Sequence, residues 1–318
     1  MNEAGNAPER DVLLATKLHV PHPPPGFVAR PRLAAQLDEG RSRRMTLVCA
    51  PAGFGKTALL AAWASGGPRP VAWLSLDEGD NDPARFWRHV AAALERARPG
   101  VSGRVGPLLG PPPPQFFEGV VTALLNELAE RPAAKQALLV LDDYHLIGAP
   151  QVHAAVRFLV DHLPPGLRLV LVTRSDPPLR LGRLRARGEL TDLRAAELRF
   201  TETEAAELLR ATPAAGDLTG SSIETLTAKT EGWAAGLRLA GLSLQSHDDA
   251  EAFVAAFSGS HRYVLDYLAE EVLDSQDPRV RTFLLETSVL GRLSGDLCCW
   301  CSPACCSPRT SRTRRSAC

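Results

Sequence analysis

The sequence of 318 residues predicts an α/β fold, in which a doubly wound parallel sheet is followed by an all-helical region. Short apolar runs alternate with helix-length amphipathic segments as far as about residue 199. From Phe200 onward, the apolar residues recur at helical spacing only. Because right-handed crossovers place the ends of all parallel strands at one edge of the sheet, we expect a ligand to bind there.

The first predicted strand, Met45 to Cys49, leads directly into the run Ala50-Pro51-Ala52-Gly53-Phe54-Gly55-Lys56-Thr57. A helix-forming segment follows this run, and a strand, a glycine-bearing turn and a helix in this order are the context of a phosphate-binding loop. Glycines let backbone N–H groups close around an anion, and the helix directs its positive end at that anion. In such a loop Lys56 would reach the terminal phosphates and Thr57 would ligate Mg²⁺. The alternative interpretation is an ordinary strand-to-helix turn.

Four further strands are predicted at 71–76, 137–141, 167–173 and 190–194, with helices between most of them. The run at 137–141 is continuously apolar, which is typical of a buried parallel strand. Pro83 is placed to start a helix that Asp82 caps. The basic run at 180–187 is expected to be a solvated loop or a subunit contact, although cations at this edge could also contact phosphates.

Two aspartates, Asp142 and Asp143, follow the strand at 137–141, and Arg174 follows the next strand. Asp142 is placed to hold Mg²⁺ directly or through water, and Asp143 could orient an attacking water. Arg174 could sense or stabilise a terminal phosphate. A turn or helix cap is the alternative for the two aspartates, and a surface ion pair is the alternative for Arg174.

The ends of the chain differ from its middle. Four prolines between residues 21 and 25 exclude a helix, so residues 16–20 are expected to be extended. The predicted parts are an N-terminal segment (1–30), the α/β domain (31–199), a helical lid (200–257), a winged-helix-like segment (258–297) and a Cys/Arg-rich tail (298–318). In the lid, Thr201 and Glu204 form a predicted capping box.

Composition narrows the functional class. Lys+Arg and Asp+Glu both number 36, so the chain has no net attraction to nucleic acid or to an anionic membrane. No apolar run is long enough to span a bilayer, and no leader peptide is visible, so a cytoplasmic protein is expected. Cys49, which lies alone in a predicted buried strand, fits a reducing compartment.

Six of the seven cysteines lie in the tail, at Cys298, Cys299, Cys301, Cys305, Cys306 and Cys318. A metal site is one interpretation, but no histidine accompanies these cysteines and their spacings match no zinc template. A disulfide cluster is another. Because the composition changes abruptly after residue 297, we also consider that the tail is out-of-frame or degenerate sequence.

Several motifs together resemble the LuxR-type large ATP-binding transcriptional regulators, which are typified by the maltose-regulon activator and belong to the STAND class of P-loop NTPases. The motifs are Thr16-Lys17-Leu18, Val28-Ala29-Arg30, Ala50 to Thr57, Trp73 to Asp77, Asp80-Asn81, Arg85-Phe86, Leu141-Asp142-Asp143-Tyr144-His145-Leu146-Ile147, Thr173-Arg174, Glu231-Gly232-Trp233, Tyr263 to Leu268, and Glu271 to Leu273. They span about residues 13 to 297.

The resemblance implies that the NTPase domain, lid and winged-helix-like segment enclose ADP in a resting monomer, and that inducer and ATP favour a self-associating form. It implies nucleotide and Mg²⁺ binding by Lys56, Thr57 and Asp142, water activation by Asp143, phosphate sensing by Arg174, and a place near the nucleoside for Arg30. The family's Gly-x-Pro, which touches the base, corresponds to Gly232-Trp233-Ala234. Contact through Ala234 is therefore in doubt.

We interpret the chain as a nucleotide-binding switch module that is truncated before the family's sensor and DNA-binding domains. It is expected to bind ATP or ADP with Mg²⁺, to hydrolyse ATP slowly if at all, and not to bind DNA. The alternative is a stand-alone P-loop ATPase or small-molecule kinase, although no phosphoacceptor motif is visible. A scaffold with a vestigial loop is a third possibility.

Overall fold

The computed structural model describes residues 13–109, 117–130, 135–212, 218–245, 249–259, 261–274 and 276–288. The chain forms two compact units, Met1–Phe257 and Ser258–Cys318. The predictions for the tail at 298–318 lie outside the described residues.

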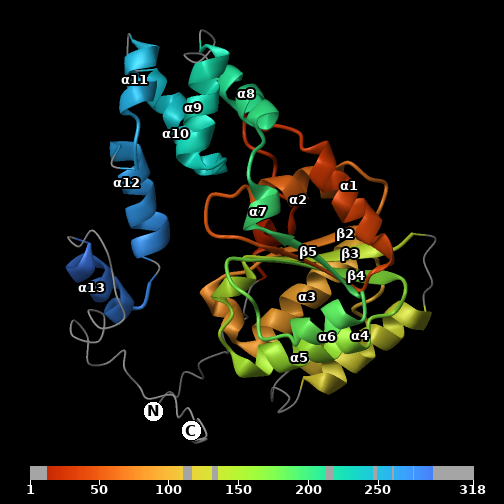
Figure 1. Ribbon diagram of the computed structural model, residues 1–318. Helices are drawn as coiled ribbons and strands as arrows, with labels where there is room; N and C mark the ends of the chain where they lie inside the picture. The colour runs from red at the N-terminus through yellow and green to blue at the C-terminus, as the bar shows by residue number, and fades with distance from the viewer. Residues whose placement is uncertain are drawn as a thin grey trace, which may run out of the picture. The chain divides into compact units, whose positions relative to one another are not determined.

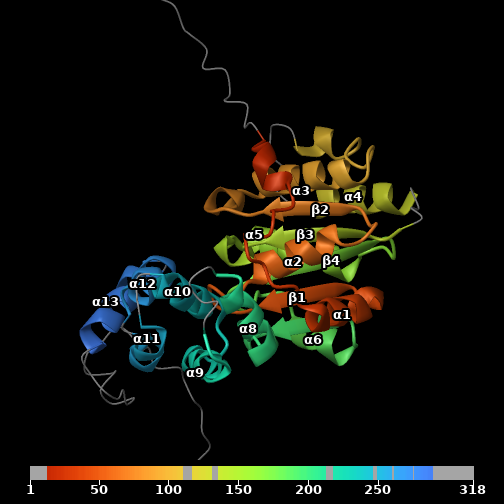
Figure 2. The same cartoon turned by 90° about the horizontal axis from the view of Figure 1, so that it is seen from above.

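Five parallel strands form one sheet in the first unit (Figure 1). The order of the strands in the sheet is β2-β3-β4-β1-β5. Figure 2 shows the neighbouring strands β2, β3, β4 and β1 from above. The strands are β1 (Met45–Cys49), β2 (Val71–Ser75), β3 (Ala137–Asp142), β4 (Leu167–Thr173) and β5 (Leu190–Arg194). Cys49 pairs with Thr173 and Ser75 pairs with Asp142, so these strands end at one edge. The predicted doubly wound parallel sheet is confirmed.

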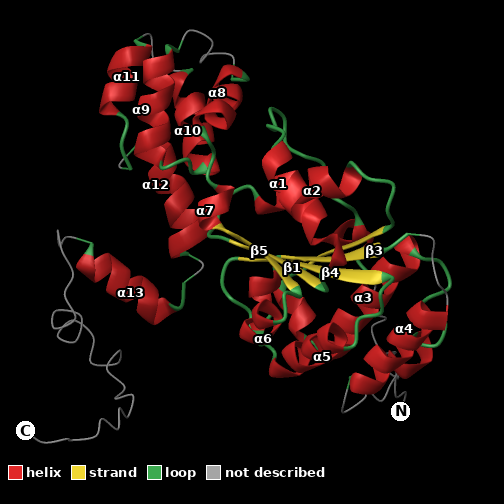
Figure 3. Ribbon diagram, turned by 45° about the vertical axis from the view of Figure 1, so that its right-hand side comes forward, coloured by secondary structure: helices red, strands yellow, loops and turns green. Residues whose placement is uncertain are grey.

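Helices cover both faces of the sheet (Figure 3). One face carries α1 (Pro31–Glu39) and α2 (Lys56–Ser65), and the other carries α3 (Pro83–Ala97), α4 (Glu118–Glu130), α5 (Pro150–Asp161) and α6 (Leu181–Ala186). Alternate strand residues enter two different cores: Leu47 packs on the α3–α6 side and Val48 packs on the α1–α2 side. Both faces of β1 are therefore buried, which explains why its sequence is apolar throughout.

Short 3-10 turns join several of these elements, namely η2 (Gly40–Ser42), η3 (Glu78–Asn81), η4 (Gly106–Leu109) and η5 (Tyr144–Leu146). The basic run at 180–187 was expected to be a solvated loop or a subunit contact; the loop prediction is wrong, because residues 181–186 of this run form α6. Leu181 and Leu184 are buried on one side of this helix, at a spacing of three residues. That apolar spacing was the sequence signal for the helix.

The N-terminal segment also differs from its prediction, because Ala15–Leu18 forms a 3-10 turn, η1, and not an extended chain. Lys17 is buried there, lies 3.0 Å from a carboxylate oxygen of Asp77, and hydrogen-bonds to Asp80. Asp80 is fully buried and also contacts His89 Nδ1 at 2.8 Å. These contacts fix residues 15–18 against the α3 side of the sheet.

The helical lid contains α8 (Glu202–Arg210), α9 (Gly220–Thr230), α10 (Ala234–Leu244) and α11 (Ala250–Ala256), and the short α7 (Ala195–Leu198) leads into it from β5. The predicted capping box is present: Glu204 N–H donates to Thr201 Oγ1 at 3.2 Å, and Thr201 N–H donates to Glu204 Oε2 at 3.0 Å. Lys229 Nζ donates to Ala255 O at 2.6 Å and so ties α9 to α11.

The second unit contains α12 (Arg262–Leu268), a π-helical turn (Ala269–Leu273) and α13 (Pro278–Thr287). The π-helical turn directly follows α12 and ends at Leu273. Asp277 caps α13 by accepting a hydrogen bond from Arg279 N–H at 2.9 Å. In the described parts of both units, no helix is long and apolar enough to cross a membrane.

Candidate nucleotide-binding site

The phosphate loop connects β1 to α2, and its backbone conformation depends on two glycines. Gly53 has φ 76° and Gly55 has φ 73°, both in the left-handed region that favours glycine. A Cβ on Gly55 would meet no atom within 4 Å, so the space beside the start of α2 is open to an anion. Ala50, which replaces the usual glycine, is buried, and its N–H donates to Thr173 O at 3.3 Å. Phe54 packs against the core beneath α1 and α2.

Lys56 is the first residue of α2 and is only 8% exposed. Its Nζ donates to Pro51 O at 2.9 Å, so the ammonium lies within the loop that it would share with phosphate. Burial lowers its pKa, and the nearby positive charge of Arg174 lowers it further. An anion between these two cations would offset their repulsion, and phosphate binding by Lys56 and Arg174 stays a prediction.

Thr57 and Asp142 meet across the edge of the sheet, where Thr57 Oγ1 donates to Asp142 Oδ1 at 3.1 Å. Burial raises the pKa of Asp142 to about 6, with a further contribution from the negative charge of Asp143. These two oxygen ligands suit Mg²⁺. Since the described residues hold no cluster of three or more His, Cys, Asp or Glu side chains that could bind a metal, the other ligands would be phosphate oxygens and water.

Asp143 has φ 58°, an uncommon conformation for a residue with a side chain. The left-handed turn separates its side chain from that of Asp142: Asp142 is buried, whereas the Asp143 side chain is 42% exposed. His145 Nδ1 lies 3.9 Å from Asp143 Oδ1. The two aspartates therefore differ in environment, and their different roles stay predictions.

A cavity of about 220 Å³ lies beside the phosphate loop. Its walls come from three parts of the chain: residues 24–30, which we call the strap; the loop with α2; and the lid. The lining residues are Pro24, Gly26, Phe27, Val28, Arg30, Gly53, Gly55, Ala58, Leu59, Phe200, Leu208, Ala234, Ala235 and Arg238. The surface is mostly apolar with two arginines, which suits a flat heterocycle attached to an anionic group.

Arg30 lies on the wall of this cavity, but most of its guanidinium binds the end of α7 and the start of the lid. Its Nη1 donates to Leu198 O at 2.8 Å, and its Nη2 donates to Glu204 Oε2 at 3.0 Å. The guanidinium carbon also stands 4.3 Å from the centre of the Phe200 ring. Its Nε is buried and has no hydrogen-bond partner in the described part of the chain. Direct contact with a nucleoside stays a prediction for Arg30.

Two lid residues contact the phosphate loop, which the sequence did not predict. Trp233 Nε1 donates to Ala52 O at 3.1 Å, and Ala235 N–H donates to Gly53 O at 3.0 Å. The Glu231-Gly232 pair carried a signal for a tight turn after α9. No sequence feature indicated what the Trp233 indole would bind.

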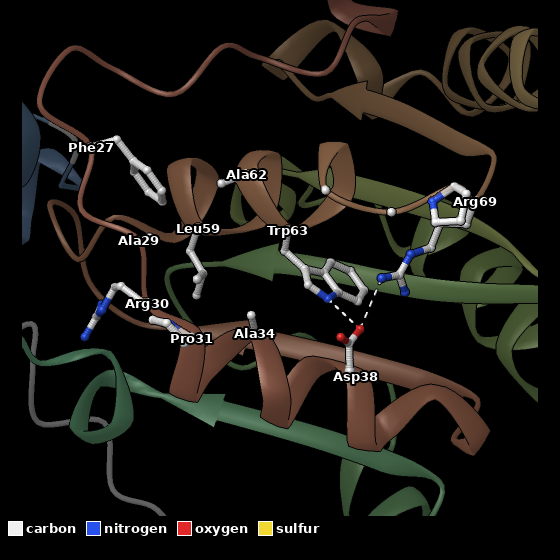
Figure 4. Close-up of a pocket in the computed structure, with 13 residues that line it drawn as sticks. Phe27, Ala29, Arg30, Pro31, Ala34, Asp38, Leu59, Ala62, Trp63 and Arg69 are labelled. Carbon is white, nitrogen blue, oxygen red and sulfur yellow. Dashed lines mark hydrogen bonds and ion pairs between the residues drawn. The ribbon is translucent and has the colours of Figure 1, made fainter.

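A second cavity, of about 420 Å³, lies between α1 and α2 (Figure 4). At one end, Asp38 Oδ1 accepts hydrogen bonds from Trp63 Nε1 at 2.9 Å and from Arg69 Nη2 at 3.1 Å. The charges at this end are thus paired with each other. Because Gly53 and Gly55 line only the first of the two cavities described, the first is the one adjoining the phosphate site.

Comparisons with known proteins agree with this geometry. An AAA domain family matches residues 38–176, and the MalT winged helix domain family matches residues 269–310. The winged-helix match extends past residue 297, at which the predicted winged-helix-like segment ends, and includes part of the predicted tail.

The chain is 37% identical over 287 residues to the serine/threonine-protein kinase PknK of Mycobacterium tuberculosis, covering 89% of this chain and 26% of PknK. It is 36% identical over 288 residues to the HTH-type transcriptional regulator MalT of Serratia proteamaculans, covering 90% and 31%. The chain thus spans about a quarter to a third of the length of these relatives. The Walker-type ATPase of Pyrococcus abyssi shares the fold, with a TM-score of 0.51 at 16% identity, over 86% of this chain and 82% of that one.

Proposed function

This chain is a MalT-like P-loop NTPase, and on that premise we propose that it is the nucleotide-binding switch module of a LuxR-type, STAND-class transcriptional regulator. The proposal is that ATP or ADP, with Mg²⁺, occupies the phosphate loop and the adjoining cavity. The observation that carries it is that a single cavity is walled by the phosphate loop, the strap and the lid. A ligand in that cavity would contact all three, and so its identity could set their arrangement.

The phosphate end of the site fits a nucleotide in charge and in shape. Gly55 leaves open space at the start of α2, and Lys56 and Arg174 supply positive charge beside it. Thr57 and Asp142 supply the oxygen ligands for Mg²⁺. When bound, Mg²⁺ would neutralise phosphate charge. Asp143, which is more exposed than Asp142, is the residue we propose to orient water for a slow hydrolysis.

The base end of the site fits an adenine ring. Phe27 and Val28 of the strap and Ala234 and Ala235 of the lid all line the cavity, and these side chains provide apolar surface for a heterocycle. The buried Nε of Arg30 offers one hydrogen-bond donor on this wall. We propose that the nucleoside binds here.

The switch would work by shifting populations. ADP, which contacts both the loop and the lid, would favour the covered form, and ATP would favour a form that self-associates. Only slow hydrolysis is needed for this purpose. Such a switch would operate in the cytoplasm, where ATP and ADP are available.

The test combines mant-nucleotide binding with ATP turnover, on the wild-type chain and on Lys56→Ala. We expect Lys56→Ala to weaken ADP binding about 100-fold, because a hydrogen bond to a charged group contributes ~2–3 kcal/mol. Lys135→Ala is the matched control, because Lys135 is exposed and lies outside the site. Wild-type turnover of about 10 per second or more would indicate a dedicated enzyme, either an ATPase or a small-molecule kinase, and would refute the switch.

A further inference from the structure

The backbone carbonyls of the phosphate loop need hydrogen-bond partners of their own. When successive N–H groups of such a loop converge on an anion, the carbonyl groups between them point outward. Pro51 O accepts from Lys56 Nζ at 2.9 Å, within the loop. The next two carbonyls, of Ala52 and Gly53, accept from the lid, through Trp233 Nε1 at 3.1 Å and the Ala235 N–H at 3.0 Å.

The turn that presents Trp233 is fixed by several independent constraints. Glu231 has φ 51° and Gly232 has φ 69°, both left-handed. Gly232 O accepts from Phe200 N–H at 2.8 Å, and a Cβ on Gly232 would stand 2.6 Å from Phe200 O. The turn is thus held tightly against the first residue of the lid, and Trp233 lies at the N-cap position of α10. A turn constrained in this way positions the indole N–H precisely enough to orient its acceptor.

We propose that Trp233 is a positioning residue of the nucleotide site, which holds the Ala52 carbonyl outward so that the loop N–H groups face the phosphates. The inference rests on the proposed function, since it concerns how that site binds phosphate. Trp233 does not line the cavity, whereas Ala234 and Ala235 do. Its effect therefore falls on the phosphate end of the ligand and not on the base.

This arrangement links the lid to the phosphate loop. A lid docked through Trp233 favours the phosphate-binding conformation of the loop, so bound phosphate must favour lid docking by the same factor. Couplings of this kind typically amount to about 5-fold to 150-fold in affinity. The Trp233–Ala52 hydrogen bond is thus a contact through which phosphate occupancy changes the position of the lid.

The experiment measures displacement of mant-ADP by ADP and by adenosine, on the wild-type chain and on Trp233→Phe. The substitution keeps an aromatic ring and removes the N–H donor. We expect the dissociation constant of ADP to rise about tenfold, as for a lost hydrogen bond to a partly buried acceptor, and that of adenosine to change less than about twofold. Trp87→Phe is the matched control, because Trp87 Nε1 is buried with no hydrogen-bond partner among the described residues.

The outcomes separate the inference from the proposed function. Equal weakening of ADP and adenosine binding would mean that Trp233 only supports the cavity wall. No weakening of either would mean that the hydrogen bond is dispensable. Each of these two results would overturn the inference, while ADP binding by the wild-type chain would still support the proposed site. If the wild type binds neither ligand, the proposed function fails, and the inference fails with it.

A second measurement does not require the Phe variant to fold. In wild-type chain labelled with 5-fluorotryptophan, the ¹⁹F resonance of Trp233, assigned with Trp233→His, should shift when ADP binds and stay in place when adenosine binds. A Trp233 resonance that responds equally to both ligands would overturn the inference.

Discussion

The nucleotide site has a phosphate side, formed by the phosphate loop and Asp142, and a cover, formed by the strap and the lid. These two parts are held in place in different ways. Lys56 and Thr57 follow β1 and Asp142 ends β3, and both strands pair with β4, so the hydrogen-bond register of the sheet places these residues together. The strap and the lid meet through a few side chains far apart in sequence, such as Arg30 and Glu204. The phosphate side is therefore as rigid as the sheet, whereas the cover depends on separable contacts. A structure divided in this way can bind an anion firmly and still open.

The largest expected effect tests whether the N-terminal segment depends on its anchor at Lys17. Asp80→Asn leaves the buried Lys17 with only the half-exposed carboxylate of Asp77 beside it, and removing one partner of a buried ion pair costs about 3–5 kcal/mol. We expect a loss of that order in the free energy of unfolding, measured by urea denaturation with circular dichroism. Asp82→Asn is the control, since Asp82 is an exposed helix cap and asparagine caps equally well. A loss below about 1 kcal/mol would show that residues 15–18 are held by other contacts.

A second prediction separates the two aspartates on the phosphate side. Asp142→Asn should weaken the Mg²⁺-dependent part of ADP binding by at least about 100-fold, since even outer residues of metal sites contribute 10-fold to 100-fold. Asp143→Asn should leave that binding nearly unchanged and lower ATP turnover. Titration of mant-ADP with and without Mg²⁺ measures the first effect. Equal losses of Mg²⁺-dependent binding in both variants would mean that the aspartates act as one group.

The sequence predicted the phosphate side much better than the cover, for a physical reason. The phosphate loop is local: its glycines, Lys56 and Thr57 are consecutive, and Asp142 is recognisable because it ends a buried strand. Parallel pairing then brings these residues together without further information. The contacts of Arg30 with Glu204 and of Trp233 with Ala52 join residues more than a hundred positions apart. No periodicity or motif encodes such a pair.

Two smaller errors in the predicted secondary structure have the same origin. The 3-10 turn at Ala15–Leu18 forms where Lys17 reaches Asp80, which is a tertiary contact that overrides the extended preference of a proline-rich segment. The basic run at 180–187 was judged by its charges, although Leu181 and Leu184 determine its packing. In both cases, local composition was outweighed by what the segment contacts.

A third prediction tests the contact between strap and lid. Glu204→Gln removes the negative charge that Arg30 and Arg32 share, and we expect it to weaken ADP binding about tenfold and to lower stability by ~2 kcal/mol. Lid docking would become less favourable while the phosphate loop stays intact. Glu207→Gln, on the exposed side of α8, is the matched control. Unchanged ADP binding would mean that the cover does not contribute to affinity.

The Glu204 carboxylate also makes the free energy of unfolding depend on pH. Burial alone would raise the pKa of Glu204, but hydrogen bonds from Arg32 and Arg30 outweigh it and lower the pKa to about 2. Since this folded-state pKa lies below the ordinary 4.5 of glutamate, the stabilisation is complete above about pH 5 and is lost as the pH falls toward 2. The stability difference between wild type and Glu204→Gln should therefore shrink from pH 6 to pH 3.5 in urea titrations. A constant difference would contradict this assignment.

The smallest expected effect concerns Arg238 and tests whether this residue acts as a part of the cover or of the phosphate side. Arg238 lines the cavity, is exposed, and donates from Nη1 to Pro25 O of the strap at 3.0 Å. As a part of the cover, it should contribute little, because exposed polar contacts contribute less than ~1 kcal/mol. Arg238→Leu should then weaken ATP and ADP equally, by less than about fivefold. Arg210→Leu, at an exposed lid position outside this cavity, is the control.

A much larger loss of affinity for ATP than for ADP in Arg238→Leu would show that Arg238 reaches the terminal phosphate. The cover would then sense the phosphate directly, and the division between a rigid anion site and a separable cover would fail at this residue.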